Sequence, residues 1–217
     1  MTGNLSVVGF FLLGAISFAT VALRFWKVGG NPQRHFGLGV GLFAVSFVIW
    51  AYFVGTKPAE LELYITLGVL PFVAGFLALV SAATFDWLPK NRMTIFTVAI
   101  LVLAGQFVLR TWVMPSAPGF SQNGLIYFHA QPLVQLIYAL IFAGGFMTSL
   151  HVVSSRIPNR LTAALTRIFF NLVVVTGLIL LVSTDDTLQY YNGNLMGAAF
   201  IGLLVVYLPG AVKGKIK

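Results

Sequence analysis

Residues 36–55 read FGLGVGLFAVSFVIWAYFVG, twenty consecutive residues without one charged side chain. A bilayer core about 30 Å thick needs about 20 largely apolar residues in a helix. This stretch therefore predicts a membrane-spanning helix and decides the fold class. Further apolar segments follow the same rule, which predicts seven spans at about 5–26, 36–55, 63–85, 93–114, 125–152, 163–184 and 193–212.

The composition of the whole chain agrees with this interpretation. Of the 217 residues, 59% are hydrophobic and 8% are charged, whereas soluble domains carry about 25% charged residues. We therefore expect an all-α integral membrane protein. The net charge of +8 lies in short runs between the apolar segments, so it does not indicate nucleic acid. The chain contains no cysteine, which excludes disulfides and thiolate chemistry.

Turn-forming residues separate the predicted spans, and the connections are too short for a soluble domain. We therefore expect a single domain over residues 1–217. The breakers are GGNP at 29–32, Pro58, Pro89, PSAPG at 115–119, Pro158 and NGN at 192–194.

The distribution of Lys and Arg predicts the orientation, because these residues are enriched in cytoplasmic loops. Eleven of the thirteen fall on one side of the predicted spans, and only Lys57 and Arg110 fall on the other. We therefore expect an outside N-terminus and a cytoplasmic C-terminus, in the plasma membrane of a prokaryote. The first span is expected to be retained, since the segment before it has no basic residue.

Small and aromatic residues are expected to pack the helices. The glycines of GLGVG at 37–41 favour close helix contact, because small residues let membrane helices approach one another. Trp26, Trp87 and Trp112 lie near span ends, as interface anchors do. Trp50 lies about one turn deeper and fits either an anchor or a packing residue.

Polar residues inside a membrane span are costly, so each is a functional candidate. Gln106 and Arg110 lie four residues apart and therefore share one face of the fourth predicted helix. His129, Gln131 and Gln135 follow in LIYFHAQPLVQLIYAL at 125–140, the outer half of the fifth predicted span. Because both sets lie at similar depth on consecutive helices, we expect them to be neighbours.

Pro132 lies among these polar residues. A proline inside a helix removes one backbone donor and clashes with the carbonyl four residues back, so we expect a bend at that depth. Two interpretations of the polar layer stay open. Either it lines an outward-opening ligand pocket with Arg110 as an anion contact, or Arg110 reaches the outer interface while the glutamines bond across helices.

Several kinds of chemistry are not expected. The topology is similar to that of microbial rhodopsins, but residues 193–212 contain no lysine for a retinal Schiff base. His129 and His151 lie about 33 Å apart along one predicted helix, so they cannot bind a single haem. No cofactor is predicted and no metal site is expected. No HExxH motif or intramembrane carboxylate pair indicates an enzyme.

An internal repeat is compatible with the sequence. The first and fifth spans run in the same direction, and each precedes a basic loop with proline, NPQRH at 31–35 and IPNRL at 157–161. Such a 3+1+3 plan resembles the arrangement of SWEET sugar transporters, although their paired proline motifs are not found here. The topology also resembles the seven-helix input regions of some bacterial and archaeal sensor kinases.

Three functions fit these observations. The first is a receptor or sensor-type module that binds a small or lipidic ligand from outside and signals to a cytoplasmic partner. The second is a small transporter built from two three-helix halves. The third is an accessory subunit of a larger membrane complex, whose polar residues face another membrane protein. In each, the lipid bilayer is a partner.

Overall fold

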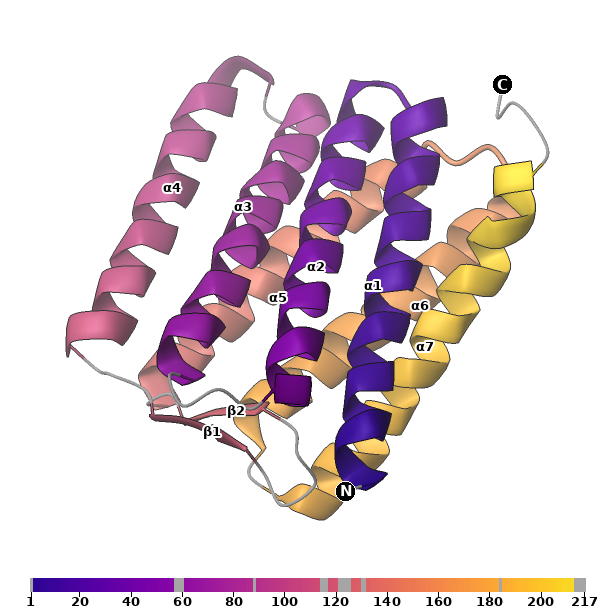
Figure 1. Ribbon diagram of the computed structural model, residues 1–217. Helices are drawn as coiled ribbons and strands as arrows, with labels where there is room; N and C mark the ends of the chain where they lie inside the picture. The colour runs from indigo at the N-terminus through magenta and orange to yellow at the C-terminus, as the bar shows by residue number, and fades with distance from the viewer. Residues whose placement is uncertain are drawn as a thin grey trace.

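The chain folds into seven α-helices in the described residues, which run alternately up and down (Figure 1). The computed structural model describes residues 2–56, 61–87, 89–113, 117–120, 126–129, 132–183 and 185–212. The helices are α1 (Thr2–Val28), α2 (Asn31–Thr56), α3 (Leu61–Trp87), α4 (Arg92–Val108), α5 (Pro132–Ser154), α6 (Arg160–Val182) and α7 (Asp186–Val212). Shorter elements are η1 (Pro89–Asn91), η2 (Leu109–Val113), β1 (Ala117–Phe120) and β2 (Ile126–His129).

Five of these helices are long and apolar enough to cross a membrane, counted over the described residues: α1, α2, α3, α6 and α7. A shorter apolar stretch, Arg92–Gly105, belongs to α4. A helix of about 20 residues spans the hydrocarbon core. The architecture is therefore that expected of a helical membrane protein.

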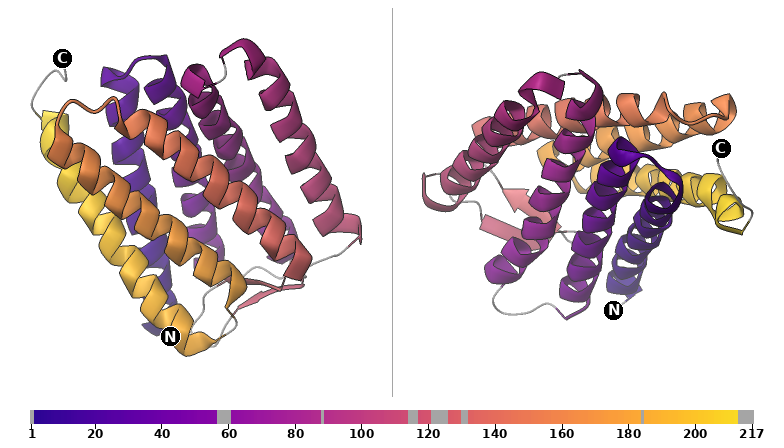
Figure 2. Two further views of the ribbon diagram at one scale, coloured as in Figure 1. Left: turned by 180° about the vertical axis from the view of Figure 1, so that it is seen from behind. Right: turned by 90° about the horizontal axis from the view of Figure 1, so that it is seen from above.

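Six helices enclose the core, and α4 lies outside them. Neighbours pack in the order α1, α2, α3, α5, α6 and α7, and α7 returns to α1. We call this set the six-helix ring. Viewed from above, α4 forms the outer edge next to α3, against which it packs (Figure 2). Segments distant in sequence therefore meet: α1 packs against α7, and both α2 and α3 pack against α5.

The two ends of the molecule differ in character. One end carries the connections from α1 to α2, α3 to α4 and α5 to α6, together with most of the basic residues. We call it the arginine end. The opposite end carries the β1–β2 hairpin and the first residues of α1 and α7, so the two chain termini lie at opposite ends (Figure 1). We call it the hairpin end.

The ring divides into two three-helix halves, α1–α3 and α5–α7, which are related by a pair of hydrogen bonds. In the first, the buried Ser17 hydroxyl of α1 donates to the Phe200 carbonyl of α7 at 3.0 Å. In the second, the buried Ser149 hydroxyl of α5 donates to the Leu79 carbonyl of α3 at 2.6 Å. The two contacts correspond, because each joins a serine hydroxyl in the first helix of one half to a backbone carbonyl in the last helix of the other half. Each hydroxyl also reaches the carbonyl four residues back in its own helix.

Burial follows the same relation between α1 and α5. When Ser17 is aligned with Ser149, further buried positions of the two helices coincide. The coinciding pairs are Gly14 with Phe146, Phe18 with Leu150 and Val21 with Val153; past the end of α5, Phe25 also matches the buried Ile157, whereas the buried Ala15 faces the exposed Met147 in this alignment. Two independent observations, a pair of hydrogen bonds and a burial pattern, therefore relate the halves, and α4 connects them.

Close helix contacts in the ring depend on glycine. A side chain at Gly39 would meet the Gly75 carbonyl of α3 at 2.7 Å, and one at Gly75 would meet the Gly39 carbonyl at the same distance. Gly37 faces the other way, where a side chain would meet the Ala22 carbonyl of α1 at 3.0 Å. The predicted packing role of GLGVG is confirmed, because its glycines admit both neighbouring helices.

The predicted fifth span, 125–152, is wrong at its start. Residues 126–129 form β2, which pairs antiparallel with β1 so that His129 lies opposite Ala117. The helix begins only at Pro132. Proline suits the first position of a helix, where its missing N–H needs no partner. Pro132 therefore does not bend a helix from within, and a short two-stranded hairpin accompanies the otherwise all-helical fold.

Two other boundaries also differ from the prediction. The last helix begins at Asp186 and not near 193, so NGN at 192–194 lies inside α7. The Asp185 carboxylate caps this helix, accepting from the backbone N–H groups of Thr187 and Leu188. The fourth helix gives way to a π-helical turn, η2, at Leu109.

Candidate functional site

The five residues predicted to form a polar layer are placed by the structure only in part. Gln106 lies in α4, Arg110 in the η2 turn and Gln135 in the first turn of α5. His129 lies in strand β2, and Gln131 falls outside the described residues. For Gln106, Arg110, His129 and Gln135, the structure describes the backbone but not the side chains. The predicted pocket among them therefore stays a prediction.

A different polar cluster is buried at the hairpin end, between α6 and α7. The Gln189 side chain is 3% exposed and donates from Nε2 to the Ser183 carbonyl at 2.7 Å. One turn on, Asn192 is equally buried and donates from Nδ2 to the Thr176 carbonyl at 2.6 Å. These bonds join the end of α6 to the start of α7 and fix both amides in place.

One atom of this cluster has no partner among the described groups. The carbonyl oxygen of Gln189, Oε1, is buried and accepts no hydrogen bond. Its orientation is set by the amide N–H, which is held by the Ser183 carbonyl. A buried polar group left unsatisfied costs about 1–3 kcal/mol. Such a group in a helical bundle is a candidate contact for a ligand.

Trp50 supplies a second such atom. Its indole nitrogen Nε1 is buried without a described partner and lies directly against Gly68 of α3. The ring is held by Phe47 at 5.6 Å and Phe72 at 5.8 Å between centroids, and by Phe11 of α1. Trp50 is therefore a packing residue. The indole N–H of a buried tryptophan usually has a hydrogen-bond partner.

The two unpartnered atoms lie at equivalent levels of the two halves. Gly68, which Trp50 covers, lies eleven residues before Leu79 in α3. Gln189 lies eleven residues before Phe200 in α7. Leu79 and Phe200 are the equivalent acceptors of the two serine bonds. We call Trp50, Gly68 and Gln189 the polar level; it offers one hydrogen-bond donor and one acceptor.

Toward the arginine end, the ring is filled by aromatic side chains. Phe146 lies 5.4 Å from Phe170 and 6.1 Å from Phe36, centroid to centroid. Phe18 stacks on Phe170 at 6.2 Å. Nearer that end, the buried hydroxyls of Thr166 and Tyr207 share a hydrogen bond of 2.7 Å. Aromatic side chains therefore fill the described ring at this level, and a buried hydroxyl pair lies between them and the arginine end.

A third unpartnered atom lies between these regions. Oδ1 of Asn171 in α6 is buried and has no described acceptor contact. One turn earlier, Arg167 donates from Nε to the Ser154 hydroxyl of α5 at 2.6 Å. No physical account of the unpartnered Asn171 atom follows from the described contacts.

Among the described residues, no group of three or more His, Asp or Glu side chains is placed to hold a metal ion. The two unpartnered atoms of the polar level are an indole N–H donor and an amide carbonyl acceptor. Comparison with protein-family models, with curated proteins and with solved structures finds no significant match to this chain.

Proposed function

We propose that the chain crosses a prokaryotic plasma membrane seven times, with the hairpin end outside and the arginine end in the cytoplasm. The alternating direction of the helices supports this arrangement, since it places the two termini at opposite ends (Figure 1). The excess of Lys and Arg at the arginine end supports the orientation.

Within that frame, we propose a seven-helix receptor or sensor-type module that binds a small or lipidic ligand entering from the hairpin end. The observation that carries the proposal is the polar level: the buried Oε1 of Gln189 has no described partner, and the unpartnered Nε1 of Trp50 covers Gly68, which corresponds to Gln189 in the other half. A ligand that bonds to both would link the halves. Signalling would then pass to a cytoplasmic partner at the arginine end.

The ligand is not retinal. Residues 186–212 of α7 contain no lysine for a Schiff base. The aromatic residues beside Trp50 favour a ligand with an apolar body, and the polar level favours one with both a donor and an acceptor. No enzymatic step is proposed.

A small transporter is the second candidate, because the two halves of the ring are related. Repeated halves with a binding site at their interface are common in secondary transporters. In this case, the serine contacts of α1 with α7 and of α5 with α3 would be the surfaces on which the halves move. The aromatic cluster around Phe170 weighs against it, since aromatic side chains fill the described ring between the polar level and the arginine end.

The test compares the purified protein with the variant Gln189→Leu. A panel of small polar and lipidic compounds is screened by thermal unfolding. We expect a compound that raises the Tm of the natural protein by several degrees, with that shift lost in the variant. Asn194→Leu, on the exposed side of α7, is the matched control and keeps the shift.

The stability of Gln189→Leu without ligand also tests whether the Gln189 amide serves a ligand or only the fold. Gln189→Leu also removes the bond from Nε2 to the Ser183 carbonyl, so we expect it to lower the free energy of unfolding by about 1 kcal/mol even if Oε1 is held for a ligand. A loss of about 2 kcal/mol or more without ligand would show that the amide is structural, and would overturn the proposed site. Uptake of the stabilising compound into proteoliposomes would favour the transporter, whereas binding without uptake favours the receptor.

A further inference from the structure

The β1–β2 hairpin lies at the same end of the molecule as the polar level (Figure 1). Strand β1 packs against α3, and strand β2 packs against α6. These two helices are not neighbours in the six-helix ring, because α5 stands between them. The hairpin therefore extends from one half of the ring to the other.

Both helices that the hairpin contacts also support the polar level. Gly68, which Trp50 covers, belongs to α3. The Ser183 carbonyl, at the end of α6, fixes the Gln189 amide. The hairpin thus connects the two helices that support the unpartnered atoms of the polar level.

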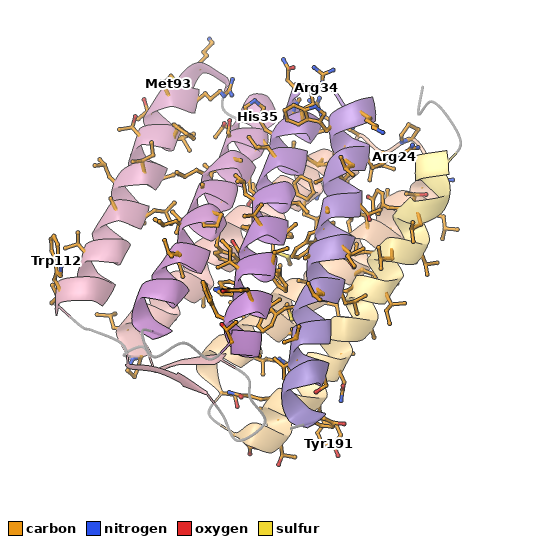
Figure 3. The ribbon with its side chains drawn as sticks, viewed as in Figure 1. Arg24, Arg34, His35, Met93, Trp112 and Tyr191 are labelled. Atoms are coloured by element: carbon orange, nitrogen blue, oxygen red, sulfur yellow. The ribbon has the colours of Figure 1, made fainter. Side chains whose placement is uncertain are left out.

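Gln189 is buried although it lies in the first turn of α7. It is the fourth residue of that helix, yet only 3% of it is exposed. Tyr191 follows two residues later, which places it on the opposite side of the helix, and it is 67% exposed at the hairpin end (Figure 3). One side of the start of α7 is therefore covered and the other is open.

The ladder between the two strands is short, so it opens at low cost. It consists of four residue pairs, from Ala117–His129 to Phe120–Ile126. A two-stranded hairpin is at best marginally stable on its own, so its position depends on its contacts with α3 and α6. Segments of low local stability are the ones that open to admit ligands.

We propose that the hairpin is the gate of the polar level. When closed, as in this structure, it covers the hairpin end through its contacts with α3 and α6. When open, it lets a ligand from outside reach Oε1 of Gln189 and Nε1 of Trp50. A ligand that links the two halves favours the closed hairpin, because the closed hairpin also joins them. This inference rests on the proposed function and adds how its site is controlled.

Proline substitutions open the ladder selectively. Pro118 has no N–H, so in an alternating antiparallel ladder the hydrogen-bonded pairs lie on either side of the pair Pro118–Phe128. One of these neighbouring pairs is Gly119–Tyr127. Tyr127→Pro therefore removes a ladder bond, whereas Phe128→Pro, the matched control, removes none.

The test places a thiol at the polar level, since the chain has no native cysteine. Purified Gln189→Cys protein is labelled with a small, charged methanethiosulfonate reagent in the absence of ligand. We expect slow labelling with the natural hairpin, about fivefold faster labelling with Tyr127→Pro and less than a twofold change with Phe128→Pro. Tyr191→Cys is exposed and should react at one rate in all three backgrounds.

Two results would overturn the gate. The first is an equal labelling rate of Gln189→Cys with and without Tyr127→Pro. The second is faster labelling of Ser17→Cys, at a fully buried position of α1, in the same variant, which would show that the hairpin holds the whole fold together.

A second variant removes the strands without adding a proline. Residues 117–129 are replaced by a Gly and Ser linker of equal length, which should speed the labelling of Gln189→Cys at least as much as Tyr127→Pro does. No increase in this variant would also overturn the gate. The proposed ligand site is tested separately, because it depends on the thermal shift and its loss in Gln189→Leu.

Discussion

The helices α2 and α4 are both apolar, but the structure uses them differently. α2 packs against α1, α3 and α5, with its glycines admitting close neighbours on two sides. The main contact of α4 with the ring is its packing against α3. A side chain added at Gly105 would meet nothing within 4 Å. An apolar composition therefore predicts the membrane, whereas the faces that carry small and large residues decide which helices form the core.

The largest difference should come from truncating a ring aromatic. Phe170 is fully buried at the centre of the aromatic cluster, so Phe170→Ala should lower the free energy of unfolding by about 3 kcal/mol through the cavity that it leaves. Leu101→Ala on α4 is the control and should change it by less than about 0.5 kcal/mol. Unfolding in mixed micelles measures both. Equal losses would contradict the separation of ring and α4.

A smaller effect should follow from adding one methyl group at a glycine. Gly39→Ala places Cβ 2.7 Å from the Gly75 carbonyl and should destabilise by about 2 kcal/mol, because two backbones must move apart. Gly105→Ala meets nothing within 4 Å and should be neutral or slightly stabilising. Thermal unfolding in detergent compares them. A stable Gly39→Ala protein would show that α2 and α3 do not approach closely.

The smallest effect tests the relation between the halves. Ser17→Ala and Ser149→Ala each remove one buried hydroxyl bond to the other half, and each should lower stability by about 0.6 kcal/mol. Thr20→Ala removes a bond within α1 only and is the control. The losses should be similar for the two serines. A large loss at one serine and none at the other would argue against equivalent halves.

Most helices of the fold could be predicted, because long uncharged stretches and closely spaced glycines can be recognised in the local sequence. The hairpin was missed because its second strand, Ile126–His129, is as apolar as a span, while Pro118 and Gly119 in its first strand are typical of a turn. Asn123–Gly124 is a dipeptide that favours hairpin turns, and it stands just before Ile126–His129. The start of α7 was missed for the opposite reason: Gln189 and Asn192 are polar, so the segment resembled a loop although its inward positions continue the stripe of Met196.

The relation between halves also left a signal in the sequence. SFATVALRF at 17–25 and SLHVVSSRI at 149–157 share serine, valine and arginine at the same spacing, with large apolar residues after the serine and at the end. The prolines of the basic loops pointed to the same helices, but their spacing differs. The polar level was not predictable in this way, because it depends on which helices become neighbours.

The proposals for the polar level depend on the hairpin end facing outward, and the absence of native cysteine makes this directly measurable. Thr187→Cys places a thiol at an exposed position of the hairpin end, and Ser155→Cys does so at the arginine end. We expect a membrane-impermeant maleimide to label Thr187→Cys in intact bacterial cells and Ser155→Cys only after permeabilisation. The reverse pattern, or labelling of both in intact cells, would contradict the arrangement.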